Sequence, residues 1–335
     1  MNGNKIFAPA NSKIIMRFIR DRFKRAGTAK DIIGLDIGSS TIKCVVLAGS
    51  ACSYQLKYYC AELISPELTG NKQASEQVVA SIKRLLASAD ILSRRCVIAL
   101  PDSVVTSHWI RMDSAVADDI ETAISLSIEE HIPYPLDEIY FDYQVFDGSA
   151  EGQNYVNVLL VACRKKHVDI RLEIMQQTDL IPLSIEVSSY AMQWAYAQLY
   201  PTELTNTSLL FDIGINHLTL LFLGEAKQMR SHSESMVNIV DKEIILQRVQ
   251  QCFSTFYLAY PYYTFNKIFF IGSNYSLLEF LVKKMIDIYG LKVEILSLNK
   301  GLNYADDVNK EKFISLFSAL YLSFSLALRG LRLSE

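Results

Sequence analysis

The feature that most constrains this chain is a short motif that occurs twice. An apolar run ends in Asp-Ile-Gly at residues 36–38 and again at residues 212–214, 176 positions further along. Each copy continues through a few mostly polar residues into a second apolar run, which predicts a strand, a tight turn and a returning strand. Glycine in such a turn allows backbone N–H groups to approach a phosphate, although ordinary hairpin turns use the same residues. Two copies at half-chain separation predict a duplicated fold that holds a ligand between its halves.

Composition and charge indicate which classes of protein this chain can belong to. The chain has 335 residues, of which 50% are hydrophobic and 21% charged, so it is long enough and apolar enough for two folded lobes. Residues 1–30 carry eight Lys or Arg against one acid, whereas the rest of the chain is net acidic. A net-acidic body argues against a nucleic-acid partner. The six cysteines show no zinc-type spacing and are expected to be free thiols in a reducing compartment.

The two ends of the sequence carry amphipathic or apolar helical patterns. Residues 14–23 place apolar side chains on one helical face with basic residues opposite, which is typical of a helix that lies on an anionic membrane or an acidic partner. A solvated, partly disordered leader is the alternative reading of this arm. Residues 313–328 are uncharged but are interrupted by serines, so we expect a buried closing helix there and not a membrane span.

Apolar periodicity orders the predicted elements between these ends. Strands beginning at residue 31 and ending at about residue 63, a helix near 78–89 and a strand at 96–100 give the order β-β-β-α-β, the ribonuclease-H-like pattern of actin-type folds. Residues 102–164 are predicted to be an inserted module, with a strand at 104–111, a helix at 116–131, and strands at 139–146 and 155–163 joined by a turn at 147–148. Further elements are expected at 166–178, 183–187, 188–199, 242–260, 267–272, 276–289 and 292–298.

The expected fold class is therefore α/β, with an actin-like, duplicated ribonuclease-H-like architecture of two lobes. The domains are expected to be a basic amphipathic arm at 1–30, a first lobe at 31–101 and 165–200, an inserted subdomain at 102–164, to which the family resemblance described below adds partner binding, and a second lobe at 201–335. The second lobe contains a truncated small subdomain, because only about 45 residues separate its hairpin from the strand at 267–272.

Several segments carry a family resemblance. They are Gly-Leu-Asp-Ile-Gly-Ser-Ser-Thr-Ile-Lys at 34–43, Ala-Leu-Pro-Asp-Ser at 99–103, Ile-Glu-Glu-His-Ile-Pro-Tyr-Pro-Leu-Asp-Glu at 128–138, Phe-Asp-Tyr at 141–143, Val-Ala-Cys-Arg at 161–164 and Ile-Glu-Val-Ser-Ser-Tyr-Ala at 185–191. In this order they resemble the type IV pilus assembly protein PilM family, actin-like relatives of the cell-division protein FtsA. The resemblance covers about residues 31–330.

The resemblance implies a cytoplasmic scaffold or adaptor that is peripheral at the inner face of the inner membrane. It implies that a groove between the first lobe and the inserted subdomain binds the N-terminal cytoplasmic peptide of an inner-membrane PilN-like protein. The chain would thereby connect to the pilus assembly platform and motor components, and so to twitching motility. The sequence identifies no residue of that groove.

The resemblance also implies a site for ATP with Mg²⁺. Asp36 would lie near the metal through water, the turn after it would offer N–H and hydroxyl donors, and a carboxylate at Glu186 would lie near the γ-phosphate. The cofactor-binding residues implied in this way are Asp36, Gly38, Ser39, Ser40, Lys43, Glu186, Asp212, Gly214 and Gly272. A purely structural role, as caps of hairpin turns, remains open for Asp36 and Asp212.

The second lobe departs from the nucleotide-binding pattern. Residues 230–240 contain no glycine, and the adenosine-side motif, usually two or three glycines, reads Gly272-Ser273-Asn274. A Cβ at a position that needs φ > 0 costs roughly 1 kcal/mol. We therefore expect weak or vestigial ATP binding, no catalytic residue and a scaffold instead of an enzyme. The alternatives are an active actin-like ATPase, a small-molecule kinase of the same fold, and the cytoplasmic portion of a type II secretion protein, which is disfavoured because no span follows the closing helix.

Overall fold

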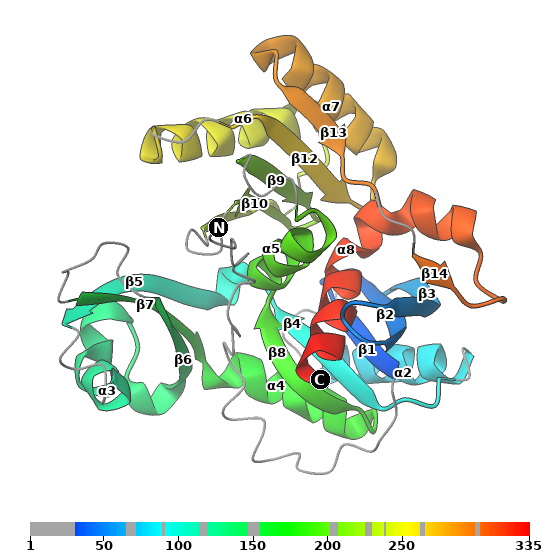
Figure 1. Cartoon of the computed structure of the whole chain (residues 1–335), viewed down its shortest axis with the longest axis horizontal. Coiled ribbons are helices and arrows are strands. Elements are labelled where there is room, and N and C mark those ends of the chain that lie inside the picture. Colours follow the sequence, from blue (N-terminus) through cyan, green and yellow to red (C-terminus); the bar gives the residue numbers. More distant parts are fainter. Residues whose placement is uncertain are drawn as a thin grey trace, which may run out of the picture.

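The structure is a computed structural model that describes residues 31–64, 72–88, 91–113, 120–146, 155–201, 207–224, 230–237, 239–261, 265–298 and 302–335. The predicted arm at 1–30 and the predicted turn at 147–148 lie outside these residues. The described residues form two large sheets and one small sheet, with helices between and around them (Figure 1).

The first lobe is built on a six-stranded sheet in the order β14-β3-β2-β1-β4-β8. Its strands are β1 (Asp31–Ile37), β2 (Thr41–Gly49), β3 (Tyr54–Leu63), β4 (Arg95–Leu100), β8 (Ile181–Val187) and β14 (Asn303–Tyr304). β1, β2 and β3 are antiparallel neighbours, whereas β4 and β8 continue the sheet in parallel. Helices α2 (Lys72–Ser88) and α4 (Lys165–Gln177) pack their apolar residues on one face.

The second lobe repeats this arrangement strand by strand. Its sheet has the order β11-β10-β9-β12-β13, again with three antiparallel strands followed by two parallel ones. Its elements are β9 (Ser208–Ile213), β10 (His217–Leu223), β11 (Ser231–Ser235), β12 (Lys267–Gly272), β13 (Lys292–Ile295), α6 (Lys242–Ala259) and α7 (Tyr275–Tyr289). Helices α6 and α7 cover the outer face of this sheet. The predicted duplication and the actin-like fold class are thus confirmed.

Two helices fill the space between the sheets. α5 (Ser188–Leu199) and α8 (Lys310–Leu333) share one core with the inward side chains of both sheets. Successive side chains of β1 point to opposite faces of the sheet, so they pack in different cores. Ile32 contributes to this central core, whereas Ile33 and Leu35 contribute to the core under α2 and α4. α8 is long and apolar enough to cross a membrane, but 72% of its most apolar window is buried inside the protein. The prediction of a buried closing helix is confirmed.

The inserted module is a three-stranded sheet with one helix. The sheet has the order β5-β7-β6, formed by β5 (Val105–Asp113), β6 (Ile139–Phe146) and β7 (Tyr155–Arg164). One face packs on α3 (Ile120–His131), and the other face contributes Leu159, Val161 and Cys163 to the core of the first lobe. Two single-turn 3-10 helices, Asp102–Val104 and Leu136–Glu138, lead into β5 and β6.

The structure changes the expected boundary between the lobes. The sequence assigns everything after residue 200 to the second lobe, yet β14 pairs in parallel with β3 of the first sheet. α8 also packs against the first sheet, and Gly34 of β1 is so close to it that a Cβ there would lie 1.9 Å from the carbonyl oxygen of Ser323. β14 was not anticipated, because two residues are too short to show strand periodicity.

Candidate functional site

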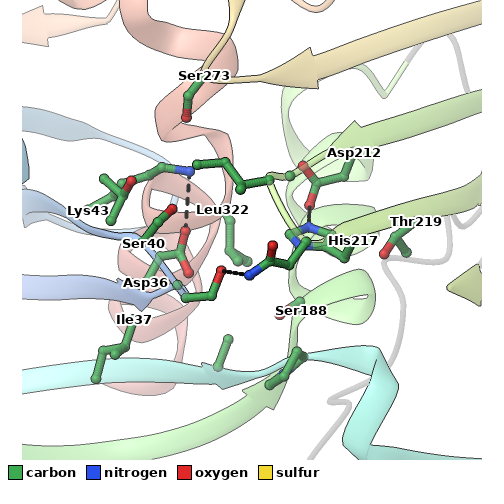
Figure 2. A pocket seen from close by; sticks show the side chains of 18 of the residues that line it. Asp36, Ile37, Ser40, Lys43, Ser188, Asp212, His217, Thr219, Ser273 and Leu322 are labelled. Carbon is green, nitrogen blue, oxygen red and sulfur yellow. Dashed lines mark hydrogen bonds and ion pairs between the residues drawn. The ribbon is translucent and has the colours of Figure 1, made fainter. Parts of the chain in front are cut away.

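A cleft of about 1480 Å³ lies between the two lobes. Both Asp-Ile-Gly turns line it, together with the end of β4 and the end of β12 (Figure 2). Eight of the nine residues predicted as cofactor-binding line this cleft: Asp36, Gly38, Ser39, Ser40, Lys43, Asp212, Gly214 and Gly272. Residues from distant parts of the chain, named below, complete it.

The first turn has the geometry of a tight hairpin. The Gly38 N–H donates to the Thr41 carbonyl at 3.0 Å, and a Cβ on Gly38 would lie 2.9 Å from that oxygen. Asp36 and Lys43 face each other across the hairpin in register, and their charged atoms are 3.6 Å apart (Figure 2). The carboxylate that was predicted to lie near a metal is therefore paired with a cation of the same hairpin.

Arg171 of α4 adds a second cation that sequence reasoning missed. Its Nη2 donates to the Ile37 carbonyl at 3.2 Å, and its buried Nε has no hydrogen-bond partner in the described structure. Burial lowers the pKa of Arg171, against the effect of the nearby Asp36 charge, but a guanidinium stays protonated at neutral pH. Nothing in the sequence around Arg171 marks it, because its place depends on how α4 packs on the first sheet.

The second turn repeats the backbone of the first with different side chains. The Gly214 N–H donates to the His217 carbonyl at 2.9 Å, as in the first turn. The His217 ring lies against Gly214, because a Cβ there would be 2.1 Å from its Cε1 atom. His217 Nε2 is 3.1 Å from Asp212 Oδ2 (Figure 2). Ile215, 60% exposed, takes the place that Ser39 has in the first turn. The imidazole therefore covers the second turn, which lacks the first turn's hydroxyl donors.

Asp212 and His217 each change the pKa of the other. Burial alone would raise the pKa of Asp212, but the charge and hydrogen bond of His217, with a contribution from Lys43, hold it below its usual value. Burial alone would lower the pKa of His217, but the Asp212 carboxylate, aided by Asp36, raises it. Each group thus favours the charged form of the other.

Direct hydrogen bonds cross the cleft from one lobe to the other. The Asn216 side-chain amide donates to Ser39 Oγ at 3.1 Å. Asp102, at the end of β4, accepts from Ser231 Oγ of β11 at 2.9 Å and from the Ser189 N–H of α5 at 3.1 Å. Burial raises the pKa of Asp102. In the sequence, Asp102 belongs to the family motif at 99–103 but has no predicted role, because its partner on β11 is 129 positions away.

Glu186 does not lie in the cleft, so its predicted place beside a γ-phosphate is wrong. It is 3% exposed, its Oε1 is 3.5 Å from Arg329 Nε of α8, and it accepts a hydrogen bond from Ser184 Oγ at 2.9 Å. Alternation along β8 sends Ile185 and Val187 into the core under α2 and α4, so that Glu186 points to the opposite face, which α8 covers.

The backbone conformation and the close packing at Gly272 both require a residue without a side chain. Its φ is +154°, and a Cβ there would lie 2.6 Å from the Ile213 carbonyl oxygen. The strain expected for the two residues after it does not arise, since Asp179 is the one non-glycine residue with positive φ in the part of the chain that the structure describes. Asn274 instead caps α7 by accepting a hydrogen bond from the Leu277 N–H at 3.1 Å.

Comparisons with known proteins agree with this architecture. Residues 34–234 match the family described as type IV pilus assembly protein PilM. The solved PilM-PilN type IV pilus biogenesis complex contains a chain with 20% identity and a TM-score of 0.78, over 92% of this chain and 100% of that one. The ethanolamine utilization protein EutJ from Carboxydothermus hydrogenoformans matches with 9% identity and a TM-score of 0.51, over 92% of this chain and 93% of its own. At these identities, the structural matches concern the fold alone.

Proposed function

The chain belongs to the type IV pilus assembly protein PilM family, whose pattern covers residues 34–234, and we propose that it is a scaffold that binds a PilN-like inner-membrane protein. The proposal rests on this match and on the inserted module, which lies within the matched residues. A chain of the same fold was solved as a PilM-PilN complex, which supports a PilN-like partner. Contacts with the pilus assembly platform and motor, and a part in twitching motility, belong to the same proposal.

We place the partner's N-terminal cytoplasmic peptide on the face of the module sheet that is turned toward α4. Trp109 and Phe146 lie on this face with ring centroids 5.0 Å apart, and both are only partly buried. Tyr140 of the same face donates a hydrogen bond from its hydroxyl to Asp169 of α4 at 3.2 Å, so that α4 borders the surface. A pair of partly exposed aromatic rings beside a helix suits the apolar side chains of an extended peptide.

Titration of the full chain with the synthetic N-terminal peptide of the PilN-like partner tests this placement. Calorimetry should show binding of one peptide, and Trp109→Ala should weaken it by roughly 30-fold, as expected for a central aromatic anchor. Leu258→Ala is the matched control, because Leu258 is an exposed apolar residue on the distant α6. Equal loss in both variants, or no binding by the wild-type chain, would contradict the proposal.

Nucleotide binding is proposed to be weak and confined to the first turn. Its N–H and hydroxyl donors, with Lys43 and Arg171, suit phosphate oxygens, and ATP with Mg²⁺ would bring its metal near Asp36. His217 covers the second turn, whereas the Ser39 hydroxyl accepts a hydrogen bond from Asn216 and keeps its own O–H to donate. The residues therefore fit phosphates on one side of the cleft only, which favours the scaffold over an ATPase or kinase.

A labelled ATP analogue with Mg²⁺ tests this point. We expect weak binding that Asp36→Ala abolishes, with no phosphate release above background. Tight binding with steady phosphate release would favour the alternative, an active actin-like ATPase.

We further propose a location in the cytoplasm, peripheral at the inner face of the inner membrane. The partner is an inner-membrane protein, and the basic sequence of residues 1–30 suits an anionic lipid surface. Sedimentation with anionic liposomes should recover the full chain and lose a variant that lacks residues 1–30. Equal sedimentation of both would exclude membrane docking by this arm.

A further inference from the structure

The edge strand β11 carries polar side chains on the face of its sheet that packs under α6 and is otherwise apolar. In its register with β10, His232 lies opposite Leu220 and Glu234 opposite Leu218. Both leucines are fully buried in the core beneath α6. Residues that lie opposite each other in a pair of strands share a face, so His232 and Glu234 also project toward α6. An imidazole and a carboxylate therefore stand side by side at the border of an apolar core.

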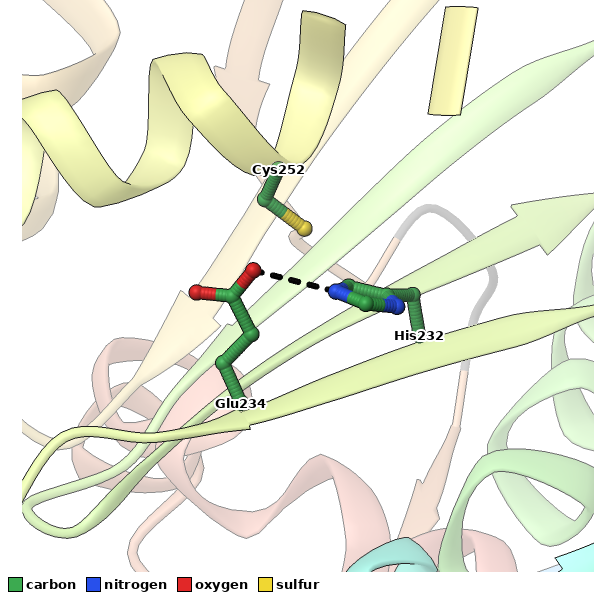
Figure 3. Close-up of side chains that lie close together, drawn as sticks. All are labelled: His232, Glu234 and Cys252. Atoms are coloured by element: carbon green, nitrogen blue, oxygen red, sulfur yellow. Dashed lines mark hydrogen bonds and ion pairs between the residues drawn. The ribbon is translucent and has the colours of Figure 1, made fainter. Parts of the chain in front are cut away.

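Helix α6 brings a cysteine to the same place. Cys252 is fully buried, and one ligand atom from each of Cys252, His232 and Glu234 lies within 4.8 Å of the others. His232 Nε2 and Glu234 Oε1 are 3.0 Å apart. Figure 3 shows the three side chains converging from β11 and α6. The side chains of His232 and Glu234 are 44% and 27% exposed, so the cluster is open to solvent on one side.

We propose that His232, Glu234 and Cys252 bind a transition-metal dication of the Zn²⁺ type. A thiolate and an imidazole favour such a metal over Mg²⁺ or Ca²⁺, which prefer oxygen ligands. Two ligand atoms with bonds of about 2.1 Å at tetrahedral angles are about 3.4 Å apart, close to the spacing of the His232 and Glu234 atoms. Three protein ligands leave a fourth position on the exposed side for water or for a group from a partner.

Metal binding at this cluster is coupled to a proton. Cysteine binds a dication as the thiolate, so binding releases the thiol proton of Cys252 to solvent. The metal would hold β11 against α6. It would also secure Ser231, the β11 residue that donates to Asp102 of the first lobe.

Cobalt substitution tests the site. The metal-free full chain is titrated with Co²⁺ at neutral pH, and we expect a thiolate-to-cobalt absorption band in the near ultraviolet that saturates at one equivalent and that Zn²⁺ removes. Cys252→Ser should abolish the band. His232→Ala should weaken binding on the order of 100-fold, since it removes a direct ligand. Cys52→Ser, which removes an exposed thiol elsewhere, is the matched control and should leave the band unchanged.

A second measurement protects the test against a misfolded variant. Zn²⁺ should raise the thermal midpoint of the wild-type chain and of Cys52→Ser, but not that of His232→Ala, whose changed side chain is partly exposed. The proposal fails if the cobalt band persists in Cys252→Ser, if Cys52→Ser removes it, or if no stoichiometric binding occurs.

Discussion

At the scale of single residues, the carboxylate of each turn has a basic partner in its own hairpin. The Asp36 carboxylate is 3.6 Å from the Lys43 ammonium, and the Asp212 carboxylate is 3.1 Å from His217 Nε2. Arg171 adds positive charge beside the first turn. The cleft therefore suits the phosphate oxygens of a ligand better than it suits a bare divalent cation.

The Asp212–His217 pair predicts a pH dependence. The pKa of His217 is raised on folding, so its stabilisation is complete below the unfolded value of about 6.5 and is lost as the pH rises through the folded value. The lowered pKa of Asp212 gives stabilisation that is present at neutral pH and lost in acid. Urea unfolding should show wild type losing more stability than His217→Gln as the pH rises above about 6.5. The difference should stay below about 1 kcal/mol, because the imidazole is 45% exposed. Equal losses would contradict the pairing.

Glu186 should act on stability and not on nucleotide affinity. Glu186→Gln removes the negative charge that faces the buried Arg329, which should lower the free energy of unfolding by about 3 kcal/mol. Asp36→Ala is the contrasting variant, which should lower nucleotide affinity. Chemical denaturation and nucleotide titration of both variants separate the roles. A stable Glu186→Gln variant with reduced nucleotide affinity would restore the role that the sequence suggested for this residue.

At the scale of elements, backbone contact between β1 and α8 joins the end of the chain to the first sheet. Gly34 of β1 and Gly330 of α8 face side chains or backbone of the other element at distances that no Cβ could occupy. The glycine of the first apolar run is thus a packing requirement, separate from the turn glycine at Gly38.

Gly34→Ala should therefore destabilise the protein by about 3 kcal/mol through overpacking. The added Cβ would lie 1.9 Å from the Ser323 carbonyl oxygen and 2.4 Å from the Ala327 nitrogen. Gly290→Ala is the control, since Gly290 has φ +64° at the end of α7 and nothing within 4 Å of an added Cβ. It should cost about 1 kcal/mol from backbone conformation alone. Thermal and urea unfolding of both variants measure the difference, and equal costs would show that α8 relaxes away from β1.

At the scale of the whole molecule, the lobes are joined in two ways. α5 and α8 form one apolar core with both sheets, and polar contacts bridge the mouth of the cleft through Asn216, Ser39, Ser231 and Asp102. These contacts join the lobes through the protein's own side chains, both in the core and at the cleft.

Removing the hydrogen bonds between the lobes should make the edge strand β11 of the second lobe open more readily to solvent. In the double variant Asn216→Ala/Ser231→Ala, hydrogen exchange should increase at β11 and at the turn between β9 and β10, while β1 and β4 stay protected by the apolar core. Ser315→Ala, which removes an exposed hydroxyl on α8 outside the cleft, serves as the control. Unchanged exchange in the double variant would mean that the apolar core alone sets the position of the lobes.

Local patterns in the sequence were sufficient for most elements. The strands at 139–146 and 267–272 and the helix at 188–199 lie where apolar periodicity predicts them, and the repeated Asp-Ile-Gly turns predicted the duplication. These features can be recognised from neighbouring residues, because the alternation of apolar and polar side chains and the residue types of turns extend over only a few positions of the sequence. Eight predicted site residues meet in the cleft for the same reason, because all lie on or near strand ends.

Tertiary structure alone decided which distant side chains meet. The face of β8 that α8 covers placed Glu186 against Arg329, the packing of α4 brought Arg171 to the first turn, and the register of β11 set His232 and Glu234 beside Cys252. None of these pairings can be recognised from a periodic or local pattern in the sequence. Each depends on which surfaces of the helices and sheets pack against each other when the core forms. The sequence by itself therefore determined the family, the fold class and the turns of the cleft, while the packing of helices on sheets decided which distant side chains meet, Arg171 at the first turn among them.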